Sequence, residues 1–238
     1  MKLVIFGNGF VGKTIADSLE QNTSHNIVRI DPQYFDTEYN DNADGVILCL
    51  PTPTINGNCD DSIIVDVLST IGNDIPVLLK STVTPDLMSK YPANVTYCPE
   101  FLRAAHAAKD WAAQKQLVLG GSNTDFWKNI FSYLNTTIIV TDRTTASMTK
   151  YMHNVWLATK VAFFHDIYNS NSYNHEHMIC ILSLFENIGP SHMMAPNSEG
   201  KLGYSGHCFP KDVEAFYNFT DNKILKAVLE TNKDLQSK

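Results

Sequence analysis

The sequence has few charged residues, and they do not gather into runs. Asp, Glu, Lys and Arg make up 18% of the 238 residues, and the formal net charge is −7. Because no run of lysines and arginines is present, we expect no nucleic-acid-binding surface. Anionic ligands would have to be bound by local features, such as helix N-termini or single basic side chains.

Long apolar runs and paired cysteines are also missing. No stretch is long enough to span a bilayer, and the apolar run at residues 3–6 is ended by Gly7 before it could form the core of a signal peptide. The five cysteines are odd in number and widely spaced, without a CxxC pair. This usage predicts reduced thiols in a cytoplasmic protein, with neither a disulfide framework nor a metal site.

A glycine-rich segment follows that first apolar run. Residues 7–12 read GNGFVG, the pattern GxGxxG, and residues 13–19 have the apolar spacing of a helix. In this pattern Gly7 makes a tight turn, Gly9 lets a pyrophosphate approach and Gly12 permits close packing of helix on strand. The helix N-terminus offers amides to phosphates. The residues predicted here to bind a dinucleotide are Gly7, Gly9, Phe10, Val11 and Gly12.

An acidic residue ends the next predicted strand, at residues 27–31. Asp31 lies 19 residues after Gly12, close to where dinucleotide-binding folds carry a ribose-binding carboxylate. A carboxylate there repels a 2′-phosphate, so the cofactor is expected to be NAD. The alternative is a chance glycine turn, but strand, glycines, helix, second strand and acid all agree with an NAD site.

Apolar segments alternate with helical ones through the first 143 residues. This alternation predicts an α/β fold with a doubly wound, Rossmann-type parallel sheet, whose ligands bind beyond the C-terminal ends of the strands. Further strands are predicted at 45–50, 77–80, 95–98, 117–120 and 137–140, with helices at 63–71 and 126–134. Only helices are predicted afterwards, at 145–168, 173–188, 212–219 and 223–235. We therefore expect an NAD-binding domain at 1–143 and a smaller all-helical domain at 144–238.

Polar, proline-containing segments follow three of these strands. They are PTPT at 51–54, KSTVTP at 80–85 and PEFLR at 99–103. Each alone is most simply a loop, but three at one edge of a sheet predict a ligand rim. The residues expected to contact the cofactor there are Pro51, Thr52, Ser81 and Thr82.

Two polar residues share a face of the long predicted helix. Lys150 and Asn154 are four residues apart, which places them one turn from each other. A solvated lysine on a helix surface is the commoner case. The neighbouring positions are largely apolar, however, so this face could be interior.

The segment GYSGHCFPKD at 203–212 contains a cysteine in a reactive setting. Pro210 suits the first position of a helix, so Asp212 would lie in its first turn, close to the thiol of Cys208. Lys211 could lower the pKa of that thiol, and a thiolate with a carboxylate nearby suits covalent catalysis. For this segment alone, a buried inert cysteine is the simpler alternative.

Together these segments resemble the UDP-glucose/GDP-mannose 6-dehydrogenase family of nucleotide-sugar dehydrogenases. CFPKD at 208–212 is the most specific of the matching segments, and they span nearly the whole chain in family order. They are GNGFVG at 7–12, CLPTPT at 49–54, KSTVTP at 80–85, PEFLRAA at 99–105, KYMHN at 150–154, ATKVAF at 158–163 and GYSGHCFPKD at 203–212.

The resemblance implies an NAD-dependent, two-step oxidation of the C6 alcohol of a nucleotide sugar, most simply UDP-glucose, to a carboxylate. It implies that Cys208 holds the substrate as a thiohemiacetal and then as a thioester. Lys150 would stabilise the oxyanion, with Asn154 as its hydrogen-bonding partner. Asp212 and Thr82 would position water and move protons, and Glu100 would lie near the substrate and the nicotinamide. The long helix from about Thr145 would form a homodimer interface.

Three departures from the family pattern are visible. Ala104 replaces the second glutamate of PEFLRE, so hydrolysis of the thioester would be slow or would use another group. Ser205 replaces a glycine of the cysteine loop. The sequence ends 26 residues after Asp212, whereas family members continue into a third, nucleotide-gripping domain. We therefore expect a short form with weak nucleotide binding, or a site completed by a partner subunit.

Two other functions remain open. A two-electron dehydrogenase of smaller hydroxy acids would also pair a Rossmann domain with a helical one, and it would not need Cys208. A non-catalytic NAD-binding module would explain Ala104 and the early end of the sequence.

Overall fold

The structure, a computed structural model, describes residues 1–34, 39, 42–170 and 173–237. The chain forms two compact units. Unit 1 consists of Met1–Pro53 and Asp60–Lys150, and unit 2 of Thr54–Cys59 and Tyr151–Lys238. The expected boundary at residue 143 is the start of a long helix, whereas the two units divide within that helix.

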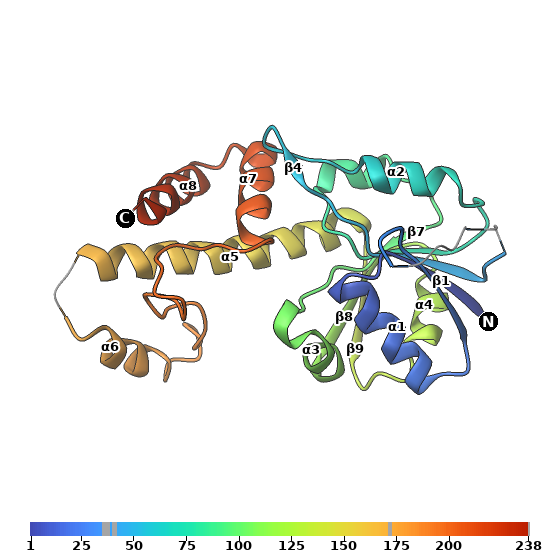
Figure 1. The fold of residues 1–238 in the computed structure, drawn as a ribbon, viewed down its shortest axis with the longest axis horizontal. Helices are drawn as coiled ribbons and strands as arrows, with labels where there is room; N and C mark the ends of the chain where they lie inside the picture. Colours follow the sequence, from blue (N-terminus) through green and yellow to red (C-terminus); the bar gives the residue numbers. More distant parts are fainter. Residues whose placement is uncertain (35–38, 40–41, 171–172, 238) are drawn as a thin grey trace. The chain divides into compact units, whose positions relative to one another are not determined.

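Unit 1 is built on a seven-stranded sheet in the order β2-β1-β3-β6-β7-β8-β9 (Figure 1). The first five of these strands are parallel, and β1 lies between β2 and β3. The loops after β1 and β3 therefore flank the point where strand order reverses, which is where such sheets bind ligands. The strands are β1 (Lys2–Phe6), β2 (Asn26–Ile30), β3 (Gly45–Leu48), β6 (Val77–Leu79), β7 (Val95–Tyr97), β8 (Gln116–Gly121) and β9 (Thr137–Thr141).

The predicted doubly wound sheet is mostly parallel, and its last two strands run opposite to the others. β8 pairs antiparallel with β7, with Thr96 opposite Gly121, and β9 is parallel to β8. The connection from β7 to β8 contains the short helices η2 (Ala104–His106) and α3 (Ala107–Ala113). Seven residues of α-helix span only about 10 Å. This connection is too short to bring the chain back to the edge of the sheet where β7 begins. β8 therefore starts at the edge where β7 ends and runs antiparallel to it.

Helices cover both faces of the sheet. α1 (Phe10–Asn22), α3 and α4 (Thr124–Ile130) share one hydrophobic core with the strands, while α2 (Ser62–Ser69) lies on the other face (Figure 1). A 3₁₀ helix, η1 (Pro85–Ser89), follows β6. The doubly wound arrangement predicted from the alternation of segments is present. The core contains, among others, Leu3, Ile5, Ile15, Leu19, Ile47, Leu78, Trp111, Trp127 and Phe131.

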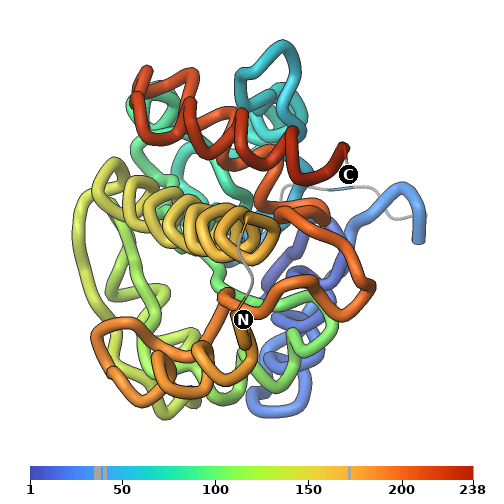
Figure 2. Tube along the Cα trace, turned by 90° about the vertical axis from the view of Figure 1, so that its left-hand side faces the viewer, coloured from blue at the N-terminus to red at the C-terminus, as the bar shows by residue number. Residues whose placement is uncertain are grey.

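α5 (Arg143–Ser170) is the longest helix, and its residues after Lys150 belong to unit 2. Within unit 2, α5 runs between α6 (His175–Leu182) on one side and α7 (Phe209–Thr220) with α8 (Lys223–Gln236) on the other (Figures 1 and 2). The helix predicted at 173–188 is shorter than expected. After Leu182 the backbone changes to tighter turns, because the amide of Leu184 bonds to the carbonyl of Ile181, three residues back.

The elements described after residue 143 are all helices, as expected, but unit 2 also includes a β-hairpin from the first half of the chain. β4 (Thr54–Ile55) and β5 (Asn58–Cys59) pair antiparallel, and the hairpin packs on α7. Its turn residues, Asn56 and Gly57, have φ of 50° and 78°. Positive φ at both central residues is what an Asn-Gly hairpin turn requires, so this dipeptide was the available sequence signal.

Candidate active site

The glycine-rich loop of unit 1 has the geometry of a phosphate-binding turn. A Cβ on Gly7 would lie 2.3 Å from the carbonyl oxygen of Cys49, and one on Gly12 would lie 1.9 Å from that of Gly7. Packing therefore demands glycine at both positions, and the φ of Gly7 is also positive, at 88°. A Cβ on Gly9 would meet nothing within 4 Å. Gly9 thus leaves open space at the start of α1, where Phe10 is exposed and Val11 is half-buried, as a pyrophosphate would need.

Asp31 lies beside this loop. One of its carboxylate oxygens accepts from the amide of Asn8 at 2.6 Å, and the other accepts from the amide of Gln33 at 2.9 Å. The carboxylate is therefore held at the glycine loop, at the position predicted for a ribose ligand. Open space at Gly9 and a carboxylate beside the glycine loop thus occur together, and both are features that a dinucleotide site would use.

The loops after β3 and β6 are joined by side-chain hydrogen bonds. Thr52 Oγ1 donates to the carbonyl of Thr82 at 2.7 Å, and the amide of Leu50 donates to Ser81 Oγ at 2.9 Å. These residues are brought together at the C-terminal edge of parallel strands, and Pro51 between them is exposed. Thr52 and Ser81 thus also fix the shape of this edge.

Lys150 and Glu100 form a buried pair within unit 1. Lys150 Nζ donates to the carbonyl of Glu100 at 2.5 Å and to its Oε1 at 3.2 Å. Oε2 of the same carboxylate accepts from the amide of Leu102 at 2.7 Å. Lys150 is interior, as its apolar neighbours suggested. An ammonium has three N–H bonds, so this arrangement leaves one for a substrate oxygen.

Cys208 and Asp212 lie at the start of α7 in unit 2. Cys208 is the N-cap residue and is half-buried, and Asp212 lies in the first turn, where it is 1% exposed. The carboxylate of Asp212 accepts from Asn154 Nδ2 at 2.7 Å and from Lys211 Nζ at 2.6 Å. Its backbone amide donates to the carbonyl of Cys208 at 3.0 Å. The helical turn thus places a buried, doubly bonded carboxylate one turn after the cysteine.

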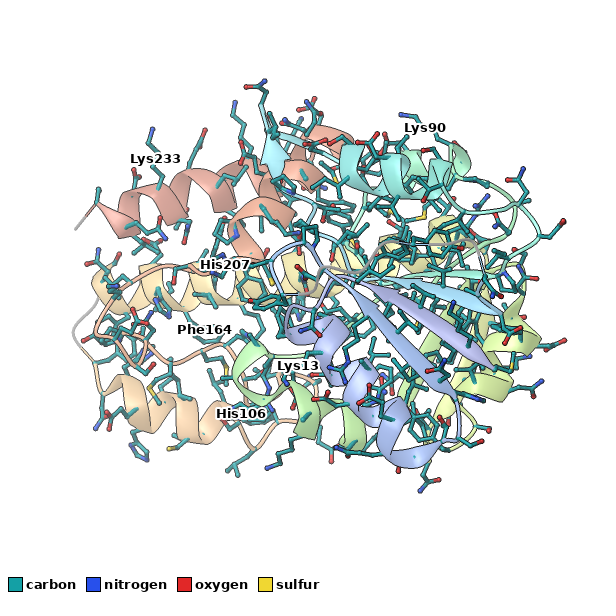
Figure 3. The ribbon with its side chains drawn as sticks, turned by 45° about the vertical axis from the view of Figure 1, so that its right-hand side comes forward. Lys13, Lys90, His106, Phe164, His207 and Lys233 are labelled. Carbon is teal, nitrogen blue, oxygen red and sulfur yellow. The ribbon has the colours of Figure 1, made fainter. Side chains whose placement is uncertain are left out.

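The loop before Cys208 accommodates the serine that departs from the family pattern. Gly203 and Gly206 have φ of 79° and 84°, whereas Ser205 is not among the residues with positive φ in the described part of the chain. Glycine is therefore required on either side of Ser205 but not at it. His207, the exposed residue before the cysteine, is labelled in Figure 3.

Two residues that hold this loop escaped the sequence analysis. Asn232 Oδ1 accepts from the amide of Tyr204 at 2.6 Å, and His165 Nδ1 accepts from the amide of Gly203 at 2.9 Å. Both are buried and lie on helices far from the loop in sequence. No local motif marks them, and only their polar character at core-facing helix positions could have drawn attention.

Ala104 is exposed in η2, the short helix that also carries His106 in Figure 3. An acid that does lie close to this helix is Asp110, which is paired with Arg103. Of the six residues predicted to be catalytic, three lie in each unit. Unit 1 holds Thr82, Glu100 and Lys150, and unit 2 holds Asn154, Cys208 and Asp212.

Solved structures of dehydrogenases superpose on nearly the whole chain. A UDP-glucose dehydrogenase from the archaeon Pyrobaculum islandicum matches with a TM-score of 0.84, covering 98% of this chain and 68% of that chain at 21% identity. A 3-hydroxyisobutyrate dehydrogenase from Mycobacterium tuberculosis matches with a TM-score of 0.73, covering 99% of this chain and 94% of that chain at 15% identity. The fold is therefore that of the Rossmann-type dehydrogenases.

Sequence comparison narrows this class. Residues 144–234 match the family described as UDP-glucose/GDP-mannose dehydrogenase family, central domain. The UDP-glucose 6-dehydrogenase of Rickettsia felis is 31% identical over 224 residues, which cover 82% of this chain and 49% of that protein. The Campylobacter jejuni enzyme of that name is 27% identical over 215 residues, covering 81% and 53%.

The resemblance seen in the motifs is confirmed, because residues 144–234 match the central domain of the UDP-glucose/GDP-mannose dehydrogenase family and relatives of that name align with most of the chain. The chain spans about half the length of the curated relatives it matches. Among the described residues, no helix combines the length and the apolar character that crossing a membrane would require.

Proposed function

We propose that this chain carries the oxidising centre of an NAD-dependent nucleotide-sugar 6-dehydrogenase that converts UDP-glucose to UDP-glucuronate. The observation that supports this most is the start of α7. Cys208 caps the helix, and the buried carboxylate of Asp212, held by Asn154, follows one turn later. This is the arrangement that a covalent intermediate and its hydrolysis would use.

The cofactor would be held by the glycine loop, by Asp31 and by the edge that contains Thr52, Ser81 and Thr82. Bound NAD would accept one hydride in each of two oxidation steps. The helix N-terminus at Gly9 would face the pyrophosphate, and the carboxylate of Asp31 would bind a ribose hydroxyl.

The side chains would act on the substrate in sequence. Loss of the first hydride and of the hydroxyl proton would turn the C6 alcohol into an aldehyde. The thiol of Cys208 would then add to the aldehyde carbon, forming a C–S bond while the C=O π bond opens and the thiol proton passes to the oxygen, which gives a thiohemiacetal. Lys150 would stabilise that oxygen. One such donor is worth about 3 kcal/mol of barrier. After the second oxidation the intermediate is a thioester. Asp212 accepts a proton from water as it attacks the thioester, and cleavage of the C–S bond releases the carboxylate and restores the thiol.

The test is a count of NADH formed per molecule of sugar acid, with UDP-glucose, UDP-N-acetylmannosamine and GDP-mannose as substrates. We expect two NADH per UDP-glucuronate. Cys208→Ala should form no acid, while its affinity for NAD stays unchanged. Cys208→Ser should also lack turnover. If Cys208→Ala produces acid at the wild-type rate, the covalent scheme is wrong.

A hydroxy-acid dehydrogenase is the second candidate. It is favoured by the likeness to the 3-hydroxyisobutyrate dehydrogenase fold, which extends over 94% of that chain. This function predicts one NADH per product and little effect of Cys208→Ala. If neither nucleotide sugars nor 3-hydroxy acids reduce NAD, but NAD binds, the chain is a non-catalytic NAD-binding module.

We also propose that two copies associate through α5. Three large apolar side chains on its unit 2 portion are exposed: Met152 by 53%, Trp156 by 61% and Phe163 by 59%. Their spacings of four and seven residues place them on one helix face. An exposed apolar helix face of this kind is characteristic of an interface, and a second copy of the chain would bury it.

A further inference from the structure

Two buried lysines hold consecutive carbonyl groups after β7. Lys80, at the end of β6, donates from Nζ to the carbonyl oxygen of Pro99 at 3.3 Å and to Cys98 Sγ at 3.2 Å. Lys150 donates to the carbonyl oxygen of the next residue, Glu100, at 2.5 Å. Two lysine ammonium groups of unit 1 therefore hold the Pro99–Glu100 segment, each through one carbonyl oxygen.

The burial of Lys80 is costly. It is 2% exposed, and within the described part of the chain no carboxylate forms an ion pair with its ammonium. Its other close neighbour is the ring of Trp111, with a centroid 5.4 Å from Nζ. For stability alone, an apolar side chain of similar size would serve as well or better. Costly buried charges of this kind concentrate at functional sites.

The turn itself needs an external restraint. The last sheet bond of this segment runs from the amide of Cys98 to the carbonyl of Leu79, at 2.8 Å. Pro99 has no amide hydrogen to donate, so its carbonyl is the group through which the turn can be fixed. Lys80 supplies that bond, and the carboxylate of Glu100 is then directed at Lys150 and at the amide of Leu102.

We propose that Lys80 is a positioning residue of the dehydrogenase: its ammonium fixes the Pro99 carbonyl, so that Glu100 holds Lys150 in place for the reacting oxygen. This inference rests on the proposed function. Lys80 acts through Glu100 and Lys150 and does not touch the substrate. Since catalytic groups must be held within about 0.5 Å, the loss of this restraint should slow the chemical step.

The test is Lys80→Met in the full chain. Methionine has a similar length and packs well against Trp111, so the fold should survive. We expect kcat with UDP-glucose to fall roughly 10- to 100-fold, with KM for both substrates changed by less than about threefold. The melting temperature should stay equal or rise. Hydrogen exchange of the Leu102 amide, which now bonds to Glu100, should accelerate by about tenfold or more.

Lys160→Met is the matched control. Lys160 is also a buried lysine that donates to two carbonyls, those of Ile188 and Gly189, at 2.9 and 3.4 Å. This variant should keep kcat and the exchange rate of Leu102 at their wild-type values. If Lys80→Met retains wild-type kcat and exchange, or if its melting temperature falls in step with kcat, the inference is overturned.

The two proposals fail in different ways. If the wild-type chain forms no NADH with any nucleotide sugar, the proposed function fails. The role of Lys80 is then decided by exchange at Leu102 together with the melting temperature. Faster exchange at an equal or higher melting temperature supports positioning of the turn, and unchanged exchange overturns it.

Discussion

Arg29 and Asp31 lie two residues apart beside the glycine loop and carry opposite charges. Arg29 Nη2 is bound by Asp17 at 2.6 Å and by Glu20 at 2.7 Å. Its guanidinium is thus occupied by two acids of α1, while the carboxylate of Asp31 is turned to the amide of Asn8. The local charge that a bound ribose hydroxyl would meet is therefore negative, which is the basis for proposing NAD rather than NADP.

Asp31→Asn tests this preference. The amide keeps the shape of the side chain and removes its charge, so we expect the ratio of NAD to NADP affinity to fall by roughly tenfold. The measurement is isothermal titration with each cofactor. Asp125→Asn, at an exposed acid paired with Lys128, should leave the ratio unchanged. Equal ratios in wild type and Asp31→Asn would remove Asp31 from the ribose site.

Cys49 and Cys98 of unit 1, half-buried and buried respectively, should be unreactive. Burial raises the pKa of Cys49 to about 12, although the nearby Lys80 partly opposes the shift. Burial likewise raises the pKa of Cys98, again opposed by Lys80. At pH 8 a thiol with that pKa of about 12 is thiolate for only about one part in ten thousand.

We therefore expect iodoacetamide at pH 8 to label the exposed Cys180 of native protein well before Cys49 or Cys98. Peptide mass spectrometry over a time course would give the order. Labelling of all three at equal rates in urea is the control for intrinsic reactivity. Early modification of Cys49 in the native protein would contradict the burial argument.

At the scale of single residues, the sequence allowed predictions that depend on the spacing of nearby residues. The apolar neighbours of Lys150 and Asn154 indicated an interior face, and both side chains are buried. The contacts of Lys80, His165 and Asn232 could not be predicted, because their partners lie 18 to 38 residues away in the sequence. Only the folded chain brings those groups together.

Among the elements, the loop that leads to Cys208 depends on a neutral histidine. The amide of Gly203 donates to His165 Nδ1, so this nitrogen carries no proton, and Nε2 donates to the carbonyl of Met194 at 2.9 Å. His165 is 2% exposed, and its burial lowers its pKa below the ordinary 6.5. The hydrogen bond to Met194 opposes this shift, and nearby His175 adds to it.

This histidine makes stability depend on pH. Below 6.5 the unfolded chain takes up a proton that folded His165 does not, so its contribution is complete above pH 6.5 and is lost as the pH falls below that value. Melting temperatures at pH 8, 6.5 and 5.5 should show the decline. His165→Gln should flatten it, whereas His177→Gln, at an exposed position of α6, should not. An equally steep decline in both variants would exclude His165 as the cause.

The β4–β5 hairpin is anchored to α7 near both ends of that helix. Thr54 Oγ1 donates to the carbonyl of Lys211 at 2.9 Å, and a Cβ on Gly57 would lie 1.8 Å from Asn218 Nδ2. Gly57→Ala therefore combines an unfavourable positive φ with a clash. We expect a loss of about 1–2 kcal/mol of stability, measured by urea unfolding.

Gly189→Ala separates the two effects, because Gly189 has a similar φ of 72° with nothing within 4 Å of the added Cβ. It should cost less than Gly57→Ala, and Asn218→Ala should remove the excess. Equal losses for the two glycine variants would show that the hairpin tip does not press on α7.

Apolar spacing in the sequence predicted some of these elements and could not predict others. Apolar spacing located α1, α5, α7 and α8 because each has a continuous buried stripe. It could not give the direction of β8, since a parallel and an antiparallel strand bury the same residues. Apolar spacing also could not predict the two strands of the hairpin, because two residues are too few to show a period.

At the scale of the whole molecule, the exposed face of α5 is the surface through which we propose that two copies associate. Trp156→Glu would place a charge in the proposed contact between copies, so we expect dimer dissociation to increase by at least about tenfold. Sedimentation velocity over a concentration series measures this. Ile224→Glu, at a 68% exposed apolar residue of α8, is the control and should leave the association unchanged. A wild-type chain that stays monomeric at high concentration would refute the interface.

The hairpin has a consequence for how such proteins can be recombined. Unit 2 draws one of its pieces, Thr54–Cys59, from the middle of the first half of the chain. A chimera that joined residues 151–237 to a foreign nucleotide-binding domain would inherit α7 without the strands that brace it. Successful exchange of modules therefore requires transplanting six residues from a distant stretch of the gene together with the helices.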